Sequence, residues 1–149
     1  MLEIINNLKP FFEDCYERYS VREYARIFKI SPPTASKILK RLNKEGLLNV
    51  SKENNYLFFW ANKENKIFIE LSRIYWRYKL KEFTEYANKI FINPTIILFG
   101  SLSKAETKLD SDIDIAIFAV KKEINTKEFA EKLKRELQIF IFNSPKEVK

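Results

Sequence analysis

The sequence predicts a protein of mixed class, with an α+β region at the amino terminus and an α/β region at the carboxyl terminus. Up to about residue 60, short amphipathic helices precede two strand-like runs around a polar turn. Strand and helix patterns alternate in the later part, which is typical of an α/β arrangement. Residues 26–44 hold six basic and no acidic residues, whereas residues 94–149 hold ten basic and nine acidic residues. We therefore expect two domains, over residues 1–62 and 63–149.

The composition limits the size and chemistry of these domains. A chain of 149 residues has room for one ordinary domain or two very small ones. Its 46% hydrophobic residues are enough for a packed core and exclude a disordered chain. The single cysteine, Cys15, excludes an internal disulfide, and no stretch has the pattern of a signal peptide or a membrane span. We therefore expect a cytoplasmic protein with no membrane partner.

The absence of histidine removes several kinds of active site. No Ser-His or Cys-His pair, histidine-ligated zinc or histidine base is available. Catalysis would therefore rest on carboxylates, lysines, hydroxyls or a bound metal. The net charge of +7 suits a polyanionic partner, and the amino-terminal half is the basic one.

The first sixty residues contain clear signals for the starts and ends of helices. Hydrophobic residues recur at helical spacing over residues 2–12. Ser20 followed by Glu23 is a capping box for a short second helix. Ser31 before a proline starts a third helix, and Gly46 ends it. Two strand-like runs follow around a polar turn at 52–55, over residues 47–51 and 56–60.

The third helix, expected to end near Glu45, has one hydrophobic face and one basic face. Its inward positions are Ala35, Ile38, Leu39 and Leu42. A helix that enters the DNA major groove needs such a docking face and a cationic outer face. Four residues near its start are placed for base edges: Pro33, Thr34, Ser36 and Lys37. Three later residues are placed for phosphates: Lys40, Arg41 and Lys44.

Two short helices, a tight turn and a β-hairpin occur in the order of a winged helix-turn-helix. Residues 21–60, with ISPPTASKILKRLNKEGLL at their centre, resemble the winged-helix transcription regulators of prokaryotes. The resemblance implies binding to double-stranded DNA and, by analogy, a homodimer. Two alternatives stay open: an ordinary amphipathic helix whose lysines keep the protein soluble, and a winged helix that docks a protein.

The second half changes from helices to alternating elements. A helical pattern covers residues 65–90, as one long helix or two abutting helices, and Asn93-Pro94 ends it. This stretch can pack on either half of the chain. The expected elements that follow are a strand over 95–99, a short helix, a strand over 112–120, a helix over 126–136 and a strand over 137–142.

Two short motifs in this half together indicate a nucleotide site. Gly100 and Ser101 follow a hydrophobic strand, and ten residues separate them from an Asp-x-Asp motif at Asp112 and Asp114. Residues two apart share a face of a strand, so the aspartates project together and repel each other, which a divalent cation such as Mg²⁺ relieves. Gly100 lets the backbone approach a phosphate, and Ser101 offers a hydroxyl and an N–H at a helix start. Lys104, one turn on, suits a triphosphate.

The segment FGSLSKAETKLDSDIDIAIF, residues 99–118, resembles the minimal nucleotidyltransferases of the polymerase-beta superfamily. Residues 65–142 resemble that domain in order and length. The resemblance implies a small mixed-sheet, nucleotidyltransferase-like α/β domain after the winged helix-turn-helix. It makes two residues the catalytic metal ligands: Asp112 and Asp114. It assigns three residues to the nucleotide phosphates: Gly100, Ser101 and Lys104.

Two positions depart from the pattern of that family. Ala105 stands where a small residue, usually glycine, follows the basic position. The third carboxylate of the family belongs on the last strand, where the matching residue is Gln138, a neutral amide. Glu136 is adjacent but is expected on the other face or at the helix end. Losing one negative ligand weakens a second metal and removes the base for the attacking hydroxyl, so nucleotide binding is expected to survive better than turnover.

Two classes of function therefore stay open. The first, which we favour, is a DNA-bound enzyme that binds a nucleoside triphosphate with Mg²⁺ and transfers a nucleotidyl group to an unidentified acceptor. The second is a non-catalytic transcription regulator whose second half is a nucleotide sensor or a protein-docking surface. Minimal nucleotidyltransferases often resemble antitoxins that act with a toxin, so a protein acceptor or toxin partner is expected by analogy alone.

Overall fold

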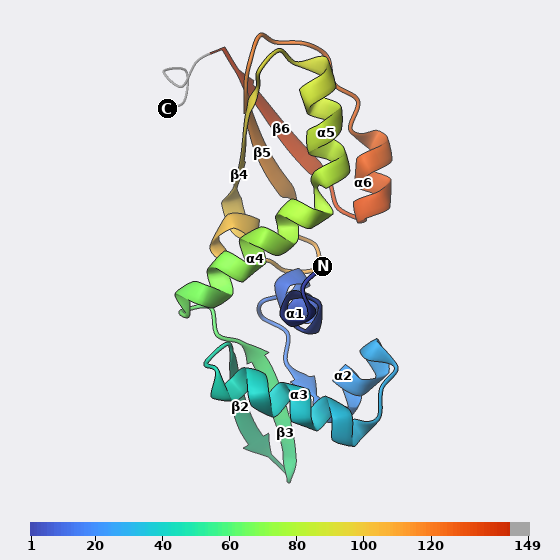
Figure 1. Cartoon of the computed structure of the whole chain (residues 1–149), viewed down its shortest axis with the longest axis vertical. Coiled ribbons are helices and arrows are strands. Elements are labelled where there is room, and N and C mark those ends of the chain that lie inside the picture. The colour runs from blue at the N-terminus through green and yellow to red at the C-terminus, as the bar shows by residue number, and fades with distance from the viewer. Residues whose placement is uncertain (144–149) are drawn as a thin grey trace.

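A computed structural model describes residues 1–143, and its elements form two regions with a long helix between them (Figure 1). The first region contains α1 (Glu3–Glu13), β1 (Tyr19–Ser20), α2 (Val21–Phe28), α3 (Pro32–Lys44), β2 (Leu48–Glu53) and β3 (Tyr56–Ala61). The rest contains α4 (Lys66–Lys79), α5 (Lys81–Ile90), β4 (Thr95–Phe99), the 3-10 helix η1 (Gly100–Lys104), β5 (Ile113–Phe118), α6 (Lys127–Leu133) and β6 (Leu137–Phe142). The last six residues of the expected domain 63–149 lie outside the described residues.

The helix starts in the first region follow the predicted capping signals. The Ser20 hydroxyl accepts a hydrogen bond from the Glu23 N–H at 3.2 Å, and the Glu23 carboxylate accepts one from the Ser20 N–H at 3.1 Å. The Ser31 hydroxyl accepts one from the Thr34 N–H at 3.4 Å, at the start of α3. Gly46 follows α3 with a φ of +81°, a conformation that glycine adopts without strain.

The hairpin of β2 and β3 differs in detail from the expected four-residue turn. Both strands are longer than predicted, and a two-residue turn at Asn54 and Asn55 joins them. Both asparagines have positive φ, 50° and 65°, as a tight hairpin turn requires. The sheet order is β1-β3-β2, all antiparallel. The sequence did not predict β1, because two residues are too short to show a period.

Helix α4 connects the two regions through a shared hydrophobic core. The Phe12 ring of α1 lies 5.2 Å from the Phe68 ring and 5.3 Å from the Tyr75 ring, both on α4. The helical stretch over 65–90 is two helices, which meet at Leu80. Residues from both expected domains, 1–62 and 63–149, therefore belong to one hydrophobic core. Within residues 1–143, no helix combines the length and hydrophobicity that a membrane span requires.

The second sheet has the order β4-β5-β6, with β4 antiparallel and β6 parallel to β5. Helices α5 and α6 lie on the same side of this sheet (Figure 1), and the Phe83 and Phe129 rings join them edge to face. The expected strand over 112–120 is shorter, and the expected helix over 126–136 ends at Leu133. It ends because Lys134 takes a left-handed conformation with a φ of 55°.

Candidate functional site

The two aspartates of the Asp-x-Asp motif lie at the amino end of β5. Asp112 directly precedes the strand, and Asp114 is its second residue, opposite Phe99 of β4 and Gln138 of β6. Both aspartates are half-buried, whereas Ile113 between them is fully buried on the helix side of the sheet. The strand alternation thus places both carboxylates on the side away from α5 and α6.

The carboxylate of Asp114 is in an unfavourable electrostatic environment. Partial burial, and secondarily the negative charge of Asp112, raise the pKa of Asp114 above its ordinary value. A cation between the two carboxylates would oppose both effects. A bound cation would therefore stabilise these two carboxylates, and carboxylate oxygens are ligands that hard cations such as Mg²⁺ prefer.

Gly100 is fixed by its contact with the same aspartate. Its φ is +72°, and a Cβ atom at this position would lie 2.2 Å from Asp114 Oδ2. No other residue fits here without displacing the carboxylate. The Gly-Ser turn and the Asp-x-Asp strand, which are separate in sequence, therefore form one site.

The segment after Gly100 is less helical than expected. Ser101 and Lys104 lie in η1, a 3-10 helix of five residues, which is too short for a substantial helix dipole. An anion at Ser101 would therefore depend on its hydroxyl, on backbone N–H groups and on the exposed Lys104. Ala105 ends η1 with a φ of 54°, which explains why glycine would suit this position.

Gln138 occupies the position beside the aspartates where a third carboxylate was expected. Its side-chain amide donates a hydrogen bond of 2.7 Å to Asp112 Oδ2, and its backbone pairs with that of Asp114. Glu136 lies in the turn before β6, where its carbonyl accepts a hydrogen bond from the Ile113 N–H at 2.8 Å. In the described part of the chain, no cluster of three or more acidic, cysteine or histidine side chains could hold a metal. Asp112 and Asp114 would be the side-chain ligands of a hard cation at this position.

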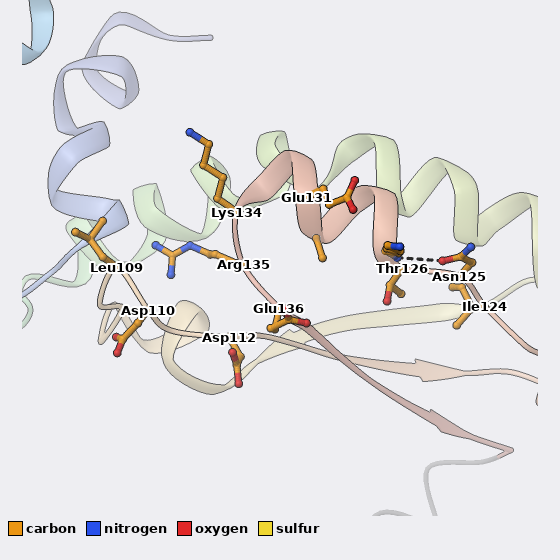
Figure 2. A pocket seen from close by; sticks show the side chains of 12 residues that line it. Leu109, Asp110, Asp112, Ile124, Asn125, Thr126, Glu131, Lys134, Arg135 and Glu136 are labelled. Atoms are coloured by element: carbon orange, nitrogen blue, oxygen red, sulfur yellow. Dashed lines mark hydrogen bonds between the residues drawn. The ribbon is translucent and has the colours of Figure 1, made fainter.

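A wide cavity of about 860 Å³ lies beside this site, between α6 and the loop before β5 (Figure 2). Asp112 borders it together with Glu136, Glu131 and Arg135. In Figure 2 the Asp112 side chain points away from α6, toward the other side of the sheet. Gly100, Ser101 and Asp114 are not among its lining residues, so the cavity adjoins the aspartate pair without containing it.

The predicted DNA-binding residues form one outer face of α3. Its inner face buries Ala35, Leu39 and Leu42, and Ile38 is half-buried. Six residues of the outer face are exposed: Pro33, Thr34, Lys37, Lys40, Arg41 and Lys44. Ser36 is half-buried and is therefore less available to a base edge than expected.

Sequence analysis assigned no role to two other basic features, a pair of arginines on α2 and one buried arginine. Arg22 and Arg26, one turn apart on α2, border a cavity of about 720 Å³ that also touches Pro32 of α3 and Tyr56 of the hairpin. The exposed positions of α2 could have indicated them. The other is Arg135, which is buried, although its charged surroundings in sequence resemble an ordinary solvent-exposed helix end.

Comparison with protein families matches residues 79–148 to the family described as polymerase beta, nucleotidyltransferase. The matched segment includes Gly100, Asp112, Asp114 and Gln138. It confirms the nucleotidyltransferase part of the resemblance and suggests nucleotidyl transfer at a coarse level. No curated protein and no solved structure matches the chain. The family match does not reach the first region, so the winged helix-turn-helix stays a prediction.

Proposed function

We propose that the second region binds a nucleoside triphosphate with Mg²⁺ and transfers a nucleotidyl group to an acceptor. The strongest support is the close approach of Gly100 to Asp114. It places the Gly-Ser turn, which could approach a phosphate, beside the two carboxylates. Asp112 and Asp114 would hold the cation. Ser101 and Lys104 would bind the phosphates, and Gly100 would allow the close approach of the backbone.

The transfer itself forms a bond from an acceptor hydroxyl to the α-phosphorus and breaks the bond to pyrophosphate. Mg²⁺, when bound, would neutralise charge on the phosphates. The acceptor hydroxyl must also lose a proton, and Gln138 offers only a neutral carbonyl oxygen for this purpose. Its amide also occupies Asp112 Oδ2. We therefore expect nucleotide binding with slow transfer in isolation.

The hydrogen bond from Gln138 also favours a second candidate function. It satisfies a carboxylate oxygen without adding charge, which suits a site that binds a nucleotide but does not turn it over. In that case the second region would be the nucleotide sensor of a regulator. The two candidates differ in turnover and agree on binding.

A comparison of Gln138→Asp and Gln138→Ala with the wild type distinguishes them. Binding of each triphosphate with Mg²⁺ is measured by calorimetry, and transfer by pyrophosphate release from labelled triphosphate. We expect Gln138→Asp to accelerate transfer at least about tenfold, or about 1.4 kcal/mol of barrier. Gln138→Ala removes the hydrogen bond to Asp112 without adding a charge, and it should not accelerate transfer. Fast transfer by the wild type with no gain in Gln138→Asp would contradict the assigned role of Gln138, and absence of binding by all three would remove both candidates.

For the first region we propose a winged helix-turn-helix that binds duplex DNA. The proposal is supported by the exposed basic face of α3, with base edges met by residues near its start and phosphates by Lys40, Arg41 and Lys44. Arg22 and Arg26 of α2 add positive charge beside the hairpin. Titration of duplex DNA at several salt concentrations tests it, and no binding at low salt would remove the assignment.

A further inference from the structure

Arg135 is the only buried cationic side chain among residues 1–143, with 3% of its side chain exposed. It lies in the turn between α6 and β6, directly after Lys134. A buried guanidinium requires acceptors for its N–H groups, and those acceptors show which parts of the molecule it connects.

Two of these acceptors belong to the loop that leads into Asp112. Arg135 Nη1 donates hydrogen bonds of 2.8 Å to the Lys108 carbonyl and 2.8 Å to the Ser111 carbonyl. The loop is also closed on itself, because the Lys108 N–H donates to Ser111 Oγ at 2.8 Å and the Ser111 N–H donates to the Lys108 carbonyl at 3.0 Å. The guanidinium thus holds both ends of this turn.

The other acceptors belong to the first region. Arg135 Nη2 donates to the Glu13 carbonyl at 2.9 Å and to Glu13 Oε2 at 3.0 Å. The guanidinium also lies over the Trp76 ring of α4, 5.1 Å from its centre. Arg135 is therefore anchored to α1 and α4, and the loop before Asp112 is attached to that anchor.

The residues after Arg135 hold Asp112 from its other side. The Glu136 carbonyl accepts the Ile113 N–H, and the Gln138 amide donates to the Asp112 carboxylate. The segment 135–138 is therefore hydrogen-bonded to the residue before Asp112, to the residue after it and to the Asp112 carboxylate. Asp112 itself lies outside the strand, because the pairing of β5 with β6 begins at Ile113.

We propose that Arg135 is a positioning residue that sets the backbone of Asp112 for cation and nucleotide binding. The proposal rests on the function proposed above for the aspartate pair. A planar guanidinium bonds to two loop carbonyls and to Glu13 at once, whereas an ammonium group cannot reproduce this fork. Arg135→Lys therefore keeps the charge and loses the geometry.

The test compares Arg135→Lys with Phe28→Leu in the full chain, well below the melting temperature of each. Phe28→Leu weakens the packing of Phe28 on Tyr24 within α2 and leaves the acceptors of Arg135 unchanged. One measurement is the Kd for ATP with Mg²⁺, and the other is the hydrogen-exchange rate of the Ile113 amide by NMR. We expect Arg135→Lys to raise the Kd about 10- to 100-fold, as loss of a residue that orients a metal ligand does, and to accelerate exchange. Phe28→Leu should change the Kd less than about twofold, since Phe28 packs on Tyr24 and makes no contact with Arg135 or with the loop before Asp112.

Each outcome either supports or overturns the positioning role of Arg135. An unchanged Kd in Arg135→Lys would overturn the positioning role. If the wild type binds no nucleotide, the proposed function fails, and exchange at Ile113 then decides the positioning role alone: faster exchange only in Arg135→Lys supports it, and equal exchange overturns it. Should Arg135→Lys not fold, Ser111→Ala removes one bond of the same turn and is expected to raise the Kd a few-fold, in the same direction as other losses around a ligand. No effect of that variant would count against the proposal.

Discussion

The proposed DNA-binding face and the proposed nucleotide site are built in opposite ways. The basic residues of α3 come from one helix, lie on its exposed side and form no hydrogen bonds or ion pairs with one another. The nucleotide site takes Gly100 from η1, Asp114 from β5 and Gln138 from β6, and each is in contact with, or paired to, another. A change in α3 should therefore be local and modest, whereas a change at the sheet should affect several groups together.

The largest expected effect is the loss of the cation response in the double variant Asp112→Asn, Asp114→Asn. With Mg²⁺ and a triphosphate at about 100 times the Kd, the wild type should melt roughly 5–10 °C higher than without ligand. The double variant should show no such increase, because both carboxylate ligands are gone.

Asp110→Asn is the matched control, since Asp110 is an exposed acid two residues before the pair. It should keep the full response. A double variant that still responds to Mg²⁺ would show that the ion binds elsewhere. DNA binding should be equal in all three proteins, because α3 is untouched.

Each region has one glycine with positive φ, so a glycine-to-alanine change can be compared between the two regions. Gly46→Ala should cost about 1 kcal/mol from its backbone conformation, because the added Cβ meets only the Asn65 amide, at 3.3 Å. Gly100→Ala should cost more and should also abolish nucleotide binding, because the Cβ would displace the Asp114 carboxylate. Melting temperatures and calorimetric titrations measure both. Equal nucleotide affinity in the two variants would contradict the assignment of Gly100.

A smaller effect is expected from Arg41→Ala on the exposed face of α3. It should weaken binding to all duplex sequences and lower the salt slope of the logarithm of the binding constant by about 1, because one phosphate contact is lost. Lys127→Ala makes the same charge change at an exposed site on α6 and should leave the slope unaltered. Fluorescence titrations at several salt concentrations measure both slopes. Identical slopes for Arg41→Ala and the wild type would remove Arg41 from the interface.

The smallest effect concerns the junction of the two regions. Burial by itself would raise the pKa of Glu13, but hydrogen bonds from Tyr75 and Arg135 and the charges of Lys79 and Arg135 leave it below its ordinary value of 4.5. A carboxyl group with a lowered folded pKa stabilises the protein fully above the unfolded pKa, and this contribution is lost as the pH falls through the folded value.

The free energy of unfolding should therefore decrease below about pH 4.5, and less steeply in Glu13→Gln. Denaturant titrations at a series of pH values measure this slope. Glu82→Gln alters an exposed carboxylate that pairs with Lys132, and it should follow the wild type closely. An equally steep loss in Glu13→Gln would show that other carboxyl groups determine the acid sensitivity.

The sequence alone was sufficient for features whose causes are local. The capping box of Ser20 and Glu23, the helix start at Ser31 and the stop at Gly46 depend on residues within a few positions of one another. The alternation of half-buried aspartates and buried isoleucines over residues 112–115 follows from the two-residue period of a strand. Gln138 was placed beside the aspartates because the resemblance to the nucleotidyltransferases implies a third carboxylate on the last strand, and the register of β5 and β6 pairs Gln138 with Asp114.

Contacts between distant segments were decided only by the tertiary structure. The pattern of residues 65–90 fitted one helix or two, and could not show that α4 packs against α1. The approach of Gly100 to Asp114 and the hydrogen bond from Gln138 to Asp112 depend on the register of three strands. Arg135 has the sequence surroundings of an exposed residue, yet it is buried because Glu13, Lys108 and Ser111 supply acceptors from parts of the chain far from it. Local rules fix the elements, whereas the site depends on which elements meet, since burial and hydrogen bonding between distant residues have no local signal in the sequence.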